Sequence, residues 1–206
     1  EHIITIEDPV ERQLEGIIQG HVNERAGMTF AAALRSMMRQ DPDVIMVGEM
    51  RDRETADLAI RAALTGHLVF STLHTNSAAA SYTRLVDMGC DPFLLTTTIR
   101  AILAQRLIRT LCYKCKVKYK PTEKDLKSLG VEKLDGFIYH ANSKGCKTCG
   151  KDGYKGRAGI YELLIPNEEI NEAVKNTASA EEVNRIAAQN KMKTLSQAAL
   201  AYVQRG

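Results

Sequence analysis

The sequence predicts an α/β fold in which helices flank a parallel sheet, and three observations support this prediction. Strand-like and helix-like patterns alternate along residues 1–89. The run from Val44 to Val47 is apolar at every position, as in a central parallel strand that is covered on both faces. Acidic or histidine side chains follow three of the predicted strands, and such strand ends share one edge of a parallel sheet.

The first elements follow a strand, short irregular segment, helix and strand order. The stretch "IITIEDP" at 3–9 reads as a strand, and "GIIQGHVNERAG" at 16–27 as irregular or short-strand material. In "MTFAAALRSMMRQ" at 28–40 the apolar residues share one helical stripe, while Arg35 and Arg39 lie on another face. Asp41-Pro42 ends this helix before the strand at 44–47.

A second helix, strand and helix follow. The stretch "RDRETADLAIRAALTG" at 51–66 has helical periodicity and ends at Gly66, "HLVFSTLH" at 67–74 is a strand, and "NSAAASYTRLVDMG" at 76–89 is a helix. We then expect one long helix over "FLLTTTIRAILAQRLIRTL" at 93–111. The tail should be helical, because Ser179 with Glu182 and Thr194 with Gln197 have capping-box spacing.

Composition indicates an ordinary globular chain with one basic segment. The 206 residues are 44% apolar and carry a net charge of +3, and no apolar run approaches the roughly 18 residues of a membrane span. Residues 105–157 hold fourteen Lys or Arg against five Asp or Glu. This excess suits a solvated lysine-rich surface or a nucleic-acid surface, and the absence of interleaved aromatic residues favours the former.

Four of the five cysteines form two C-x-x-C pairs, which are Cys112 with Cys115 and Cys146 with Cys149. Such spacing is typical of a structural zinc site in a segment with few apolar residues. Two disulfides or an iron centre with four thiolates are the alternatives, and the lack of a secretory signal argues against disulfides. Cys90 has no partner in sequence and reads as a small buried apolar residue.

The candidate catalytic side chains stand at predicted strand ends. Glu7 and Asp8 follow the first strand, Glu49 follows Gly48 after the second, and His74 ends the third. We expect Glu7, Glu49 and His74 to meet around one ligand at the carboxyl edge of the sheet. Simple turn chemistry at Glu7-Asp8 and a capping or surface role for His67, before the third strand, are the alternatives.

A phosphate-binding loop is the part that such carboxylates would serve. The pattern G-x-x-x-x-G-K-[ST] has one near match, "GCKTCGKD" at 145–152, where Asp152 replaces the required hydroxyl. This stretch carries two of the paired cysteines and lacks the flanking strand and helix. We therefore expect that the sequence begins after the phosphate loop of a longer protein, so that this chain alone hydrolyses little nucleotide.

Together these stretches resemble one family, the secretion ATPases of type II secretion and type IV pilus assembly, or GspE/PilB-like group. "ITIEDPVE", "DPDVIMVGEMRDRETA", "TGHLVFSTLHTN", "AQRLIRTLC" and the paired cysteines are similar to its Asp box, Walker B, His box and tetracysteine motifs. The resemblance implies the C-terminal part of a RecA-like P-loop NTPase core, with a Cys₄ zinc module and a C-terminal helical subdomain. The implied boundaries are 1–105, 106–160 and 161–206.

The resemblance also implies roles for single residues. Glu7 would position or activate the attacking water and Glu49 would be the Walker B acid near Mg²⁺ and the γ-phosphate, with the general-base role open between them. His67 and His74 would report the γ-phosphate state. Gly48 stands where many Walker B strands carry aspartate. The remaining candidates near nucleotide or at subunit interfaces are Asp8, Arg35, Arg39, Arg51, Arg106 and Arg109.

For the whole protein, the family implies an ATP- and Mg²⁺-dependent homo-hexamer with structural Zn²⁺, acting at the cytoplasmic face of the inner membrane with platform proteins. Protein secretion and pilus assembly stay open, since both branches share these motifs. The alternative reading is a zinc-stabilised basic module that binds nucleic acid or serves only as a docking surface. Glu7 and the Asp8-Pro9 turn after the first strand, with Glu49 after the second, favour the ATPase over a nucleic-acid surface.

Overall fold

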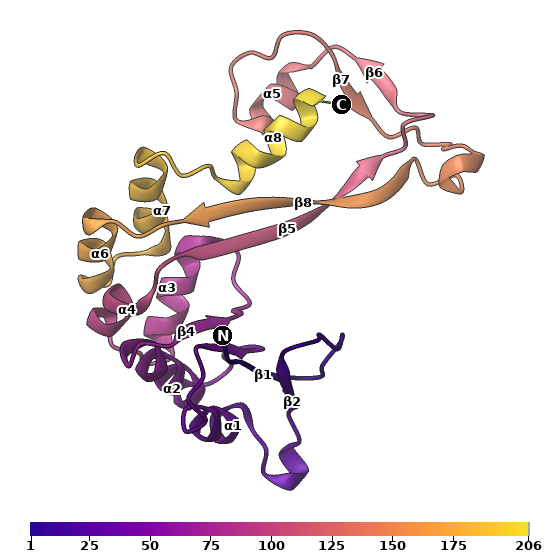
Figure 1. Ribbon diagram of the computed structural model, residues 1–206. Coiled ribbons are helices and arrows are strands. Elements are labelled where there is room, and N and C mark those ends of the chain that lie inside the picture. Colours follow the sequence, from indigo (N-terminus) through magenta and orange to yellow (C-terminus); the bar gives the residue numbers. More distant parts are fainter. Residues whose placement is uncertain (206) are drawn as a thin grey trace. The chain divides into compact units, whose positions relative to one another are not determined.

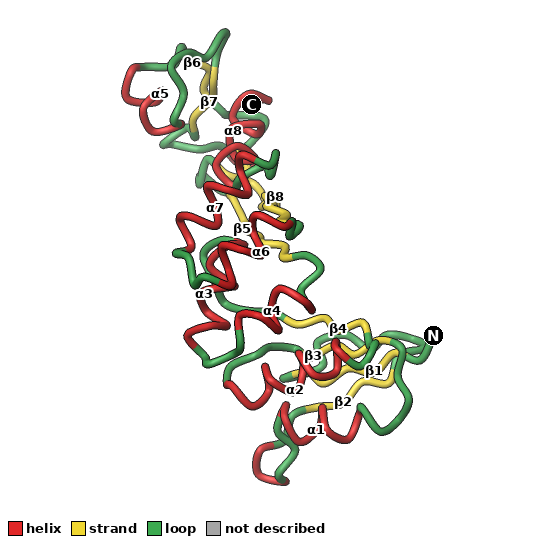
Figure 2. Tube along the Cα trace, turned by 90° about the vertical axis from the view of Figure 1, so that its left-hand side faces the viewer, coloured by secondary structure: helices red, strands yellow, loops and turns green. Residues whose placement is uncertain are grey.

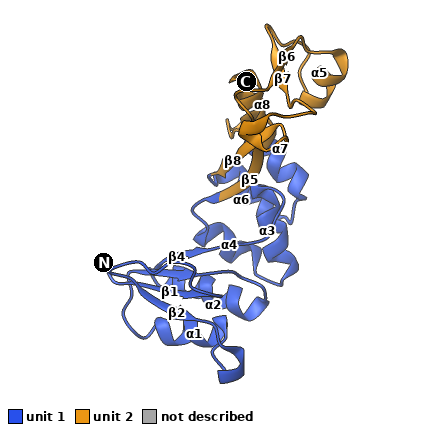
Figure 3. Cartoon of the chain, turned by 90° about the vertical axis from the view of Figure 1, so that its right-hand side faces the viewer, with its two compact units in different colours: residues 1–102, 165–187 blue, residues 103–164, 188–206 orange. Residues whose placement is uncertain are grey.

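The computed structural model describes residues 1–205, and Figure 1 shows their helices and strands. The chain divides into two compact units, residues 1–102 with 165–187 and residues 103–164 with 188–206 (Figure 3). The domain boundaries expected at 105/106 and 160/161 stay a prediction. The α/β class and the parallel sheet are confirmed.

The first unit contains a four-stranded parallel sheet in the order β2-β1-β3-β4. Its strands are β1 (Ile3–Glu7), β2 (Ile18–His21), β3 (Val44–Val47) and β4 (Leu68–Ser71). A short 3₁₀ turn, η1 (Glu24–Ala26), follows β2. Its helices are α1 (Phe30–Met37), α2 (Arg53–Leu64), α3 (Ala78–Asp87), α4 (Pro92–Thr98), α6 (Glu168–Lys175) and α7 (Ala180–Gln189).

Helices α1 and α2 cover one face of this sheet, as Figure 2 shows. Alternate strand residues point into that interface, and Leu34, Ile45 and Val47 are fully buried there. Replacing a buried leucine such as Leu34 with alanine would cost about 2–5 kcal/mol of stability. On the opposite face Leu68 and Phe70 are half exposed, so α1 and α2 leave this part of the sheet, at strand β4, uncovered.

Side-chain caps fix where the helices of the first unit begin. Thr29 accepts a hydrogen bond from the N–H of Ala32 at the start of α1, and Asp52 accepts one from Thr55 N at 2.8 Å at the start of α2. These caps satisfy N–H groups that the first helical turn leaves unpaired. The N-cap of α2, Asp52, therefore lies three residues after Glu49, which fixes the length of the connection that carries this carboxylate.

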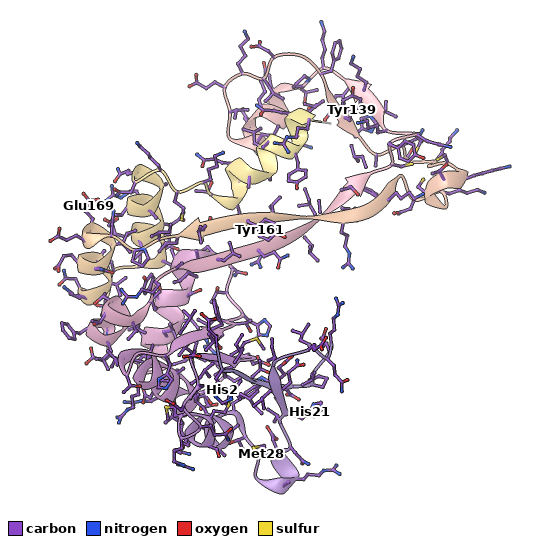
Figure 4. All side chains as sticks on the ribbon, in the orientation of Figure 1. His2, His21, Met28, Tyr139, Tyr161 and Glu169 are labelled. Carbon is purple, nitrogen blue, oxygen red and sulfur yellow. The ribbon has the colours of Figure 1, made fainter. Side chains whose placement is uncertain are left out.

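The second unit is built on two long paired strands, β5 (Ile102–Leu111) and β8 (Tyr154–Leu164). Their arrows run in opposite directions in Figure 1, and Figure 4 labels Tyr161 on β8. A β-hairpin-like pair, β6 (Val117–Tyr119) with β7 (Ile138–His140), is antiparallel. The helices are α5 (Glu123–Leu129), the 3₁₀ turn η2 (Lys147–Cys149) and α8 (Leu195–Arg205), and α8 contacts β8.

The expected long helix over 93–111 is wrong beyond Thr98, because β5 begins at Ile102. The apolar residues of this stretch fit a helical stripe, but the same stretch finds a strand partner in β8, more than forty residues later in the chain. Pairing with a distant strand overrides the local helix preference of Leu, Ala, Gln and Arg.

The helical tail is confirmed, with both expected capping contacts. Ser179 Oγ accepts from Glu182 N at 3.2 Å, and Thr194 and Gln197 exchange both bonds of a capping box. The tail helices pack in two places, however, since α6 contacts α4 in the first unit and α8 contacts β8 in the second. None of the helices among residues 1–205 has the length and apolar content needed to cross a bilayer.

Candidate active site and candidate metal centre

Three neighbouring strands bring the predicted acidic and histidine residues to one edge of the sheet. Strand β1 ends at Glu7, Gly48 and Glu49 follow β3, and His74 lies three residues after β4. Because β1, β3 and β4 are parallel neighbours, their carboxyl ends share the same edge. Of the expected group of Glu7, Glu49 and His74, the last two are in contact, and Asp8 and Arg51 join them, whereas Glu7 contacts other side chains.

Glu49 is the centre of this group and its side chain is only 16% exposed. One carboxylate oxygen pairs with the guanidinium of Arg51, and the other lies 3.3 Å from His74 Nε2. Arg51 also lies 3.5 Å from Asp8 Oδ2, so this arginine links the end of β1 to the end of β3. The His74 side chain is 88% exposed and reaches Glu49 from solvent.

The ion pair fixes the charge of Glu49. The hydrogen bond from Arg51 holds the pKa of the Glu49 carboxyl below its ordinary value, against the opposing effect of burial, and His74 contributes in the same direction. Reciprocally, Glu49 raises the pKa of Arg51. Glu49 is therefore an ionised carboxylate at neutral pH, available to accept hydrogen bonds from water.

Glu7 is held separately from this cluster. Its Oε1 accepts a hydrogen bond from Thr5 Oγ1 at 2.6 Å and another from Gln19 Nε2 at 2.9 Å. Thr5 and Gln19 are partners in the β1–β2 register, and Glu7 follows Thr5 by two residues, so all three lie on one face of the sheet. Sequence reasoning missed Thr5 and Gln19, although the period-2 alternation of β1 places Thr5 beside Glu7.

Gly48 stands where the chain passes close to its neighbours. A Cβ at this position would lie 3.2 Å from Ile6 O and 3.4 Å from a ring carbon of Phe30. A larger residue such as aspartate at this position would therefore require a shift of the adjacent backbone. Thr72 Oγ1 donates to Gly48 O at 2.7 Å and fixes this segment to the residue that follows β4.

The structure does not bring His67 to this cluster. His67 precedes β4, at the amino edge of the sheet, and its Nδ1 lies 2.8 Å from Ala62 O and 3.1 Å from Thr65 Oγ1. Those contacts match the capping alternative, and a catalytic role for His67 stays a prediction.

The other candidate arginines contact residues other than Glu49. Arg35 pairs with Glu54 between α1 and α2, and the exposed Arg39 follows α1. Arg106 and Arg109 lie on β5 in the second unit, where the Arg109 guanidinium stacks 3.8 Å from the centre of the Tyr154 ring. A nucleotide or interface role for these arginines stays a prediction.

The four paired cysteines converge in the second unit. The Cys112–Cys146, Cys115–Cys149 and Cys146–Cys149 sulfur pairs are each 3.8 Å apart, and all four sulfurs lie within 4.8 Å of one another. No disulfide joins them. Two similar backbone turns present the sulfurs, because Lys116 N donates to Cys112 O and Lys151 N donates to Cys146 O, each at 2.9 Å.

This arrangement fits a tetrahedral metal ion. Four sulfurs placed around one Zn²⁺ at about 2.3 Å are separated by ~3.8 Å along each edge of the tetrahedron. Backbone N–H groups of Cys146 and Gly153 donate to Cys149 Sγ, both at 3.2 Å, and these bonds lower the pKa of that thiol to about 6. Cys115 has the opposite tendency, since burial raises the pKa of its thiol to about 12.

Two lysines near the cysteine pairs lie over aromatic rings. Lys116 Nζ lies 4.2 Å from the centre of the Tyr139 ring, and Lys118 Nζ lies 4.2 Å from that of Phe137. Figure 4 labels Tyr139 on β7. These rings are therefore partly covered by the chain's own lysines through cation–π contacts.

Comparison with known proteins agrees with this geometry. The family model described as "Type II/IV secretion system protein" matches residues 1–206. The chain is 51% identical over 184 residues to "Type II secretion system protein E" of Pseudomonas aeruginosa, covering 89% of this chain and 36% of that protein. It is 50% identical over 194 residues to "Type IV pilus assembly ATPase PilB" of Thermus thermophilus, covering 93% of this chain and 22% of that protein.

A solved structure with the same fold is "Crystal Structure of the Pilus Retraction Motor PilT and Bound ADP", with a TM-score of 0.69 and 32% identity. The match covers 100% of this chain and 49% of the PilT chain. The fold is also shared with the Legionella pneumophila ATPase DotB, at a TM-score of 0.65 and 24% identity.

Fold and sheet-edge residues thus define an α/β protein of the RecA-like P-loop NTPase class. Within that class, the chain belongs to the type II/IV secretion system protein family. It covers 36% and 22% of the length of the two curated relatives described above, and about half of the length of the two solved chains.

Proposed function

We propose that this chain supplies the hydrolytic carboxylates of an ATPase motor that drives type II secretion or type IV pilus assembly. The observation that carries the proposal is the cluster of Glu49, Arg51, Asp8 and His74 at the carboxyl edge of the parallel sheet. Open α/β sheets bind their ligands at that edge. The names of the family and of its relatives support secretion or pilus assembly as the biological process.

In this proposal the chain's own residues orient water and sense phosphate. The ionised carboxylate of Glu49, held by Arg51, would accept a hydrogen bond from the attacking water, and Glu7 would do the same from the adjacent strand. His74 is the exposed partner of Glu49 and would respond to the terminal phosphate. Mg²⁺, when bound with ATP, would neutralise charge on the phosphates.

The phosphate-cradling loop is not among residues 1–206, where the one near match holds Cys146 and Cys149 in the thiolate cluster. We therefore expect this chain alone to hydrolyse little ATP. For the whole protein we propose a homo-hexamer at the cytoplasmic face of the inner membrane that works with membrane-embedded platform proteins. Zn²⁺ in the tetracysteine cluster would have a structural role, because four thiolates leave no open coordination position.

Replacing Glu49 with Gln in the full-length protein tests the proposal. The amide keeps the size of the side chain but loses the charge that orients water, so kcat should fall about a hundredfold or more while nucleotide binding is retained. Steady-state phosphate release and equilibrium nucleotide binding are the two measurements.

Glu54→Gln is the matched control, because Glu54 is an exposed carboxylate on α2 that pairs with Arg35. It should leave kcat near the unmodified value. A Glu49→Gln protein with normal turnover would remove Glu49 from the catalytic group.

A further inference from the structure

The connection between β1 and β2 is held mainly by one side chain, Gln19. Its amide nitrogen donates to Glu7 Oε1 at 2.9 Å and to Arg12 O at 3.1 Å, and its amide oxygen accepts from Leu14 N at 2.7 Å. The amide thus joins the carboxylate at the end of β1 to two backbone positions of the connection. Within residues 8–17, which we call the β1–β2 loop, no residue is fully buried.

Burial contributes little to the position of this loop. Leu14, a large apolar residue of the loop, is 47% exposed. An open hollow of about 470 Å³ lies against the loop and is lined by Gln13, Leu14, Glu15, Ile17 and Gln19. Because the loop lacks a packed core beneath it, the hydrogen bonds of Gln19 carry much of its placement.

His21, two residues after Gln19 on the same face of β2, provides a second anchor. Its Nδ1 accepts from Val10 N at 3.3 Å, and Figure 4 labels His21 on β2. His21 contacts the loop but not Glu7 in any hydrogen bond of the described residues. Gln19 is therefore the side chain that touches both the loop and the carboxylate.

We propose that Gln19 is a positioning residue for Glu7, coupling the orientation of its carboxylate to the conformation of the β1–β2 loop. This inference rests on the proposed function, in which Glu7 orients water. Thr5 and Gln19 both donate to Oε1, and no hydrogen bond reaches Oε2 from residues 1–205. One carboxylate oxygen is thus fixed by the protein while the other is left to accept from water.

Gln19→Leu and the isosteric Gln19→Glu test this role in the full-length protein. Leu removes the donor and the acceptor, and Glu places a second carboxylate beside Glu7. Because misplacement of a reacting group by about 1 Å can cost a hundredfold in rate, we expect kcat to fall about tenfold to a hundredfold, with KM for ATP unchanged. Arg12→Ala is the control, since Arg12 contacts Gln19 through its backbone carbonyl.

A double-mutant cycle with Glu7→Gln separates positioning from general loss of structure. If Gln19 acts through Glu7, the kcat of the double variant should equal that of Glu7→Gln alone. In the 206-residue chain, hydrogen exchange at the Leu14 amide should quicken in Gln19→Leu, which removes the acceptor of that N–H, but not in Arg12→Ala.

The outcomes distinguish the two proposals. A loss of kcat in Glu7→Gln together with normal kcat in both Gln19 variants overturns the inference and leaves the proposed function standing. Additive losses in the double variant, or a rise in KM alone, also overturn it. Normal turnover in both Glu7→Gln and Glu49→Gln would instead remove the proposed function itself.

Discussion

Arg51 decides the charge state of the sheet-edge cluster. This exposed arginine contacts Asp8 after β1 and Glu49 after β3, so one guanidinium holds two carboxylates from neighbouring strands. Its hydrogen bond is the largest effect that lowers the pKa of Glu49, and burial is the effect that opposes it. The arginine therefore both joins the strand ends and keeps the candidate catalytic carboxylate ionised.

Replacing Arg51 with Met should reduce the acid sensitivity of the chain's stability. The folded-state pKa of Glu49 lies below its ordinary value of 4.5, so its contribution is present above about pH 4.5 and is lost as pH falls through the folded-state pKa. With Arg51 removed, the pKa rises and this contribution shrinks. The difference between urea midpoints at about pH 6 and about pH 3.5 should therefore be smaller in Arg51→Met.

Arg39→Met is the control for the lost charge, because Arg39 is exposed and makes no ion pair within residues 1–205. Its difference between the two midpoints should match that of the unmodified chain. Equal acid sensitivity in Arg51→Met and Arg39→Met would show that Arg51 does not set the pKa of Glu49.

At this scale the sequence predicted the carboxylates better than the side chains that hold them. Glu49 and His74 meet because the ends of parallel strands share an edge, which alternation of strands and helices is enough to predict. Gln19 lies in a stretch with no clear period, so nothing in its pattern connects it to Glu7. His67 is the opposite case, because a histidine beside a strand can stand at either edge: it contacts Ala62 O at the amino edge, and its catalytic role stays a prediction.

Among the elements, the two cysteine knuckles replace an apolar core in the segment between β5 and β8. The two knuckles, Cys112–Cys115 and Cys146–Cys149, come from opposite ends of that segment. Their four sulfurs lie within 4.8 Å of one another. Structural zinc contributes roughly 10 kcal/mol or more to the folding of small metal-dependent units. The β6–β7 pair and η2 should therefore depend on the metal for their order.

Cys146→Ser should unfold this segment locally and leave the parallel sheet intact. The expected signs are about one zinc per chain by elemental analysis in the unmodified chain, and faster hydrogen exchange between residues 112 and 153 in the variant. Cys90→Ala is the matched control, because Cys90 is buried outside the cluster. Unchanged exchange in Cys146→Ser, or an ordered segment without zinc, would count against a structural metal.

A substitution at Gly145 tests whether the backbone turn that presents Cys146 and Cys149 supports the metal site. It has φ of +55°, and a Cβ there would lie 2.3 Å from the carbonyl carbon of Lys151, so Gly145→Ala must distort the turn. Gly130 has φ of +67° with nothing within 4 Å of its Cβ position, so Gly130→Ala carries only the cost of the left-handed conformation, about 1 kcal/mol.

The measurement is the half-time of zinc loss to an excess of chelator. Gly145→Ala should lose zinc faster than Gly130→Ala, and Gly130→Ala should resemble the unmodified chain. Equal half-times in the two variants would mean that the close approach of Gly145 to Lys151 does not support the metal site.

Strand β5 shows what sequence periodicity alone does not resolve. Its apolar residues match a helical stripe as well as a strand, and its partner β8 follows only after the whole cysteine segment. The local sequence preference of this stretch favours a helix, but its pairing with β8 makes it a strand. The tail helices were predicted correctly because their capping residues act within one turn.

At the level of the whole molecule, the chain corresponds to one part of the longer proteins of its family. The chain matches 36% and 22% of the length of the two named relatives. The parallel sheet exposes Leu68 and Phe70 on the face that α1 and α2 leave uncovered. The central claim is that the carboxyl edge of β1, β3 and β4 faces the terminal phosphate of ATP in the full-length protein.

A cryo-EM structure of the full-length protein with Mg²⁺ and a non-hydrolysable ATP analogue tests this claim most directly. We expect the terminal phosphate to lie at the edge formed by Glu7, Glu49 and His74, within the reach of one bridging water from a carboxylate. A terminal phosphate at the opposite edge beside His67, or one far from both Glu7 and Glu49, would contradict it.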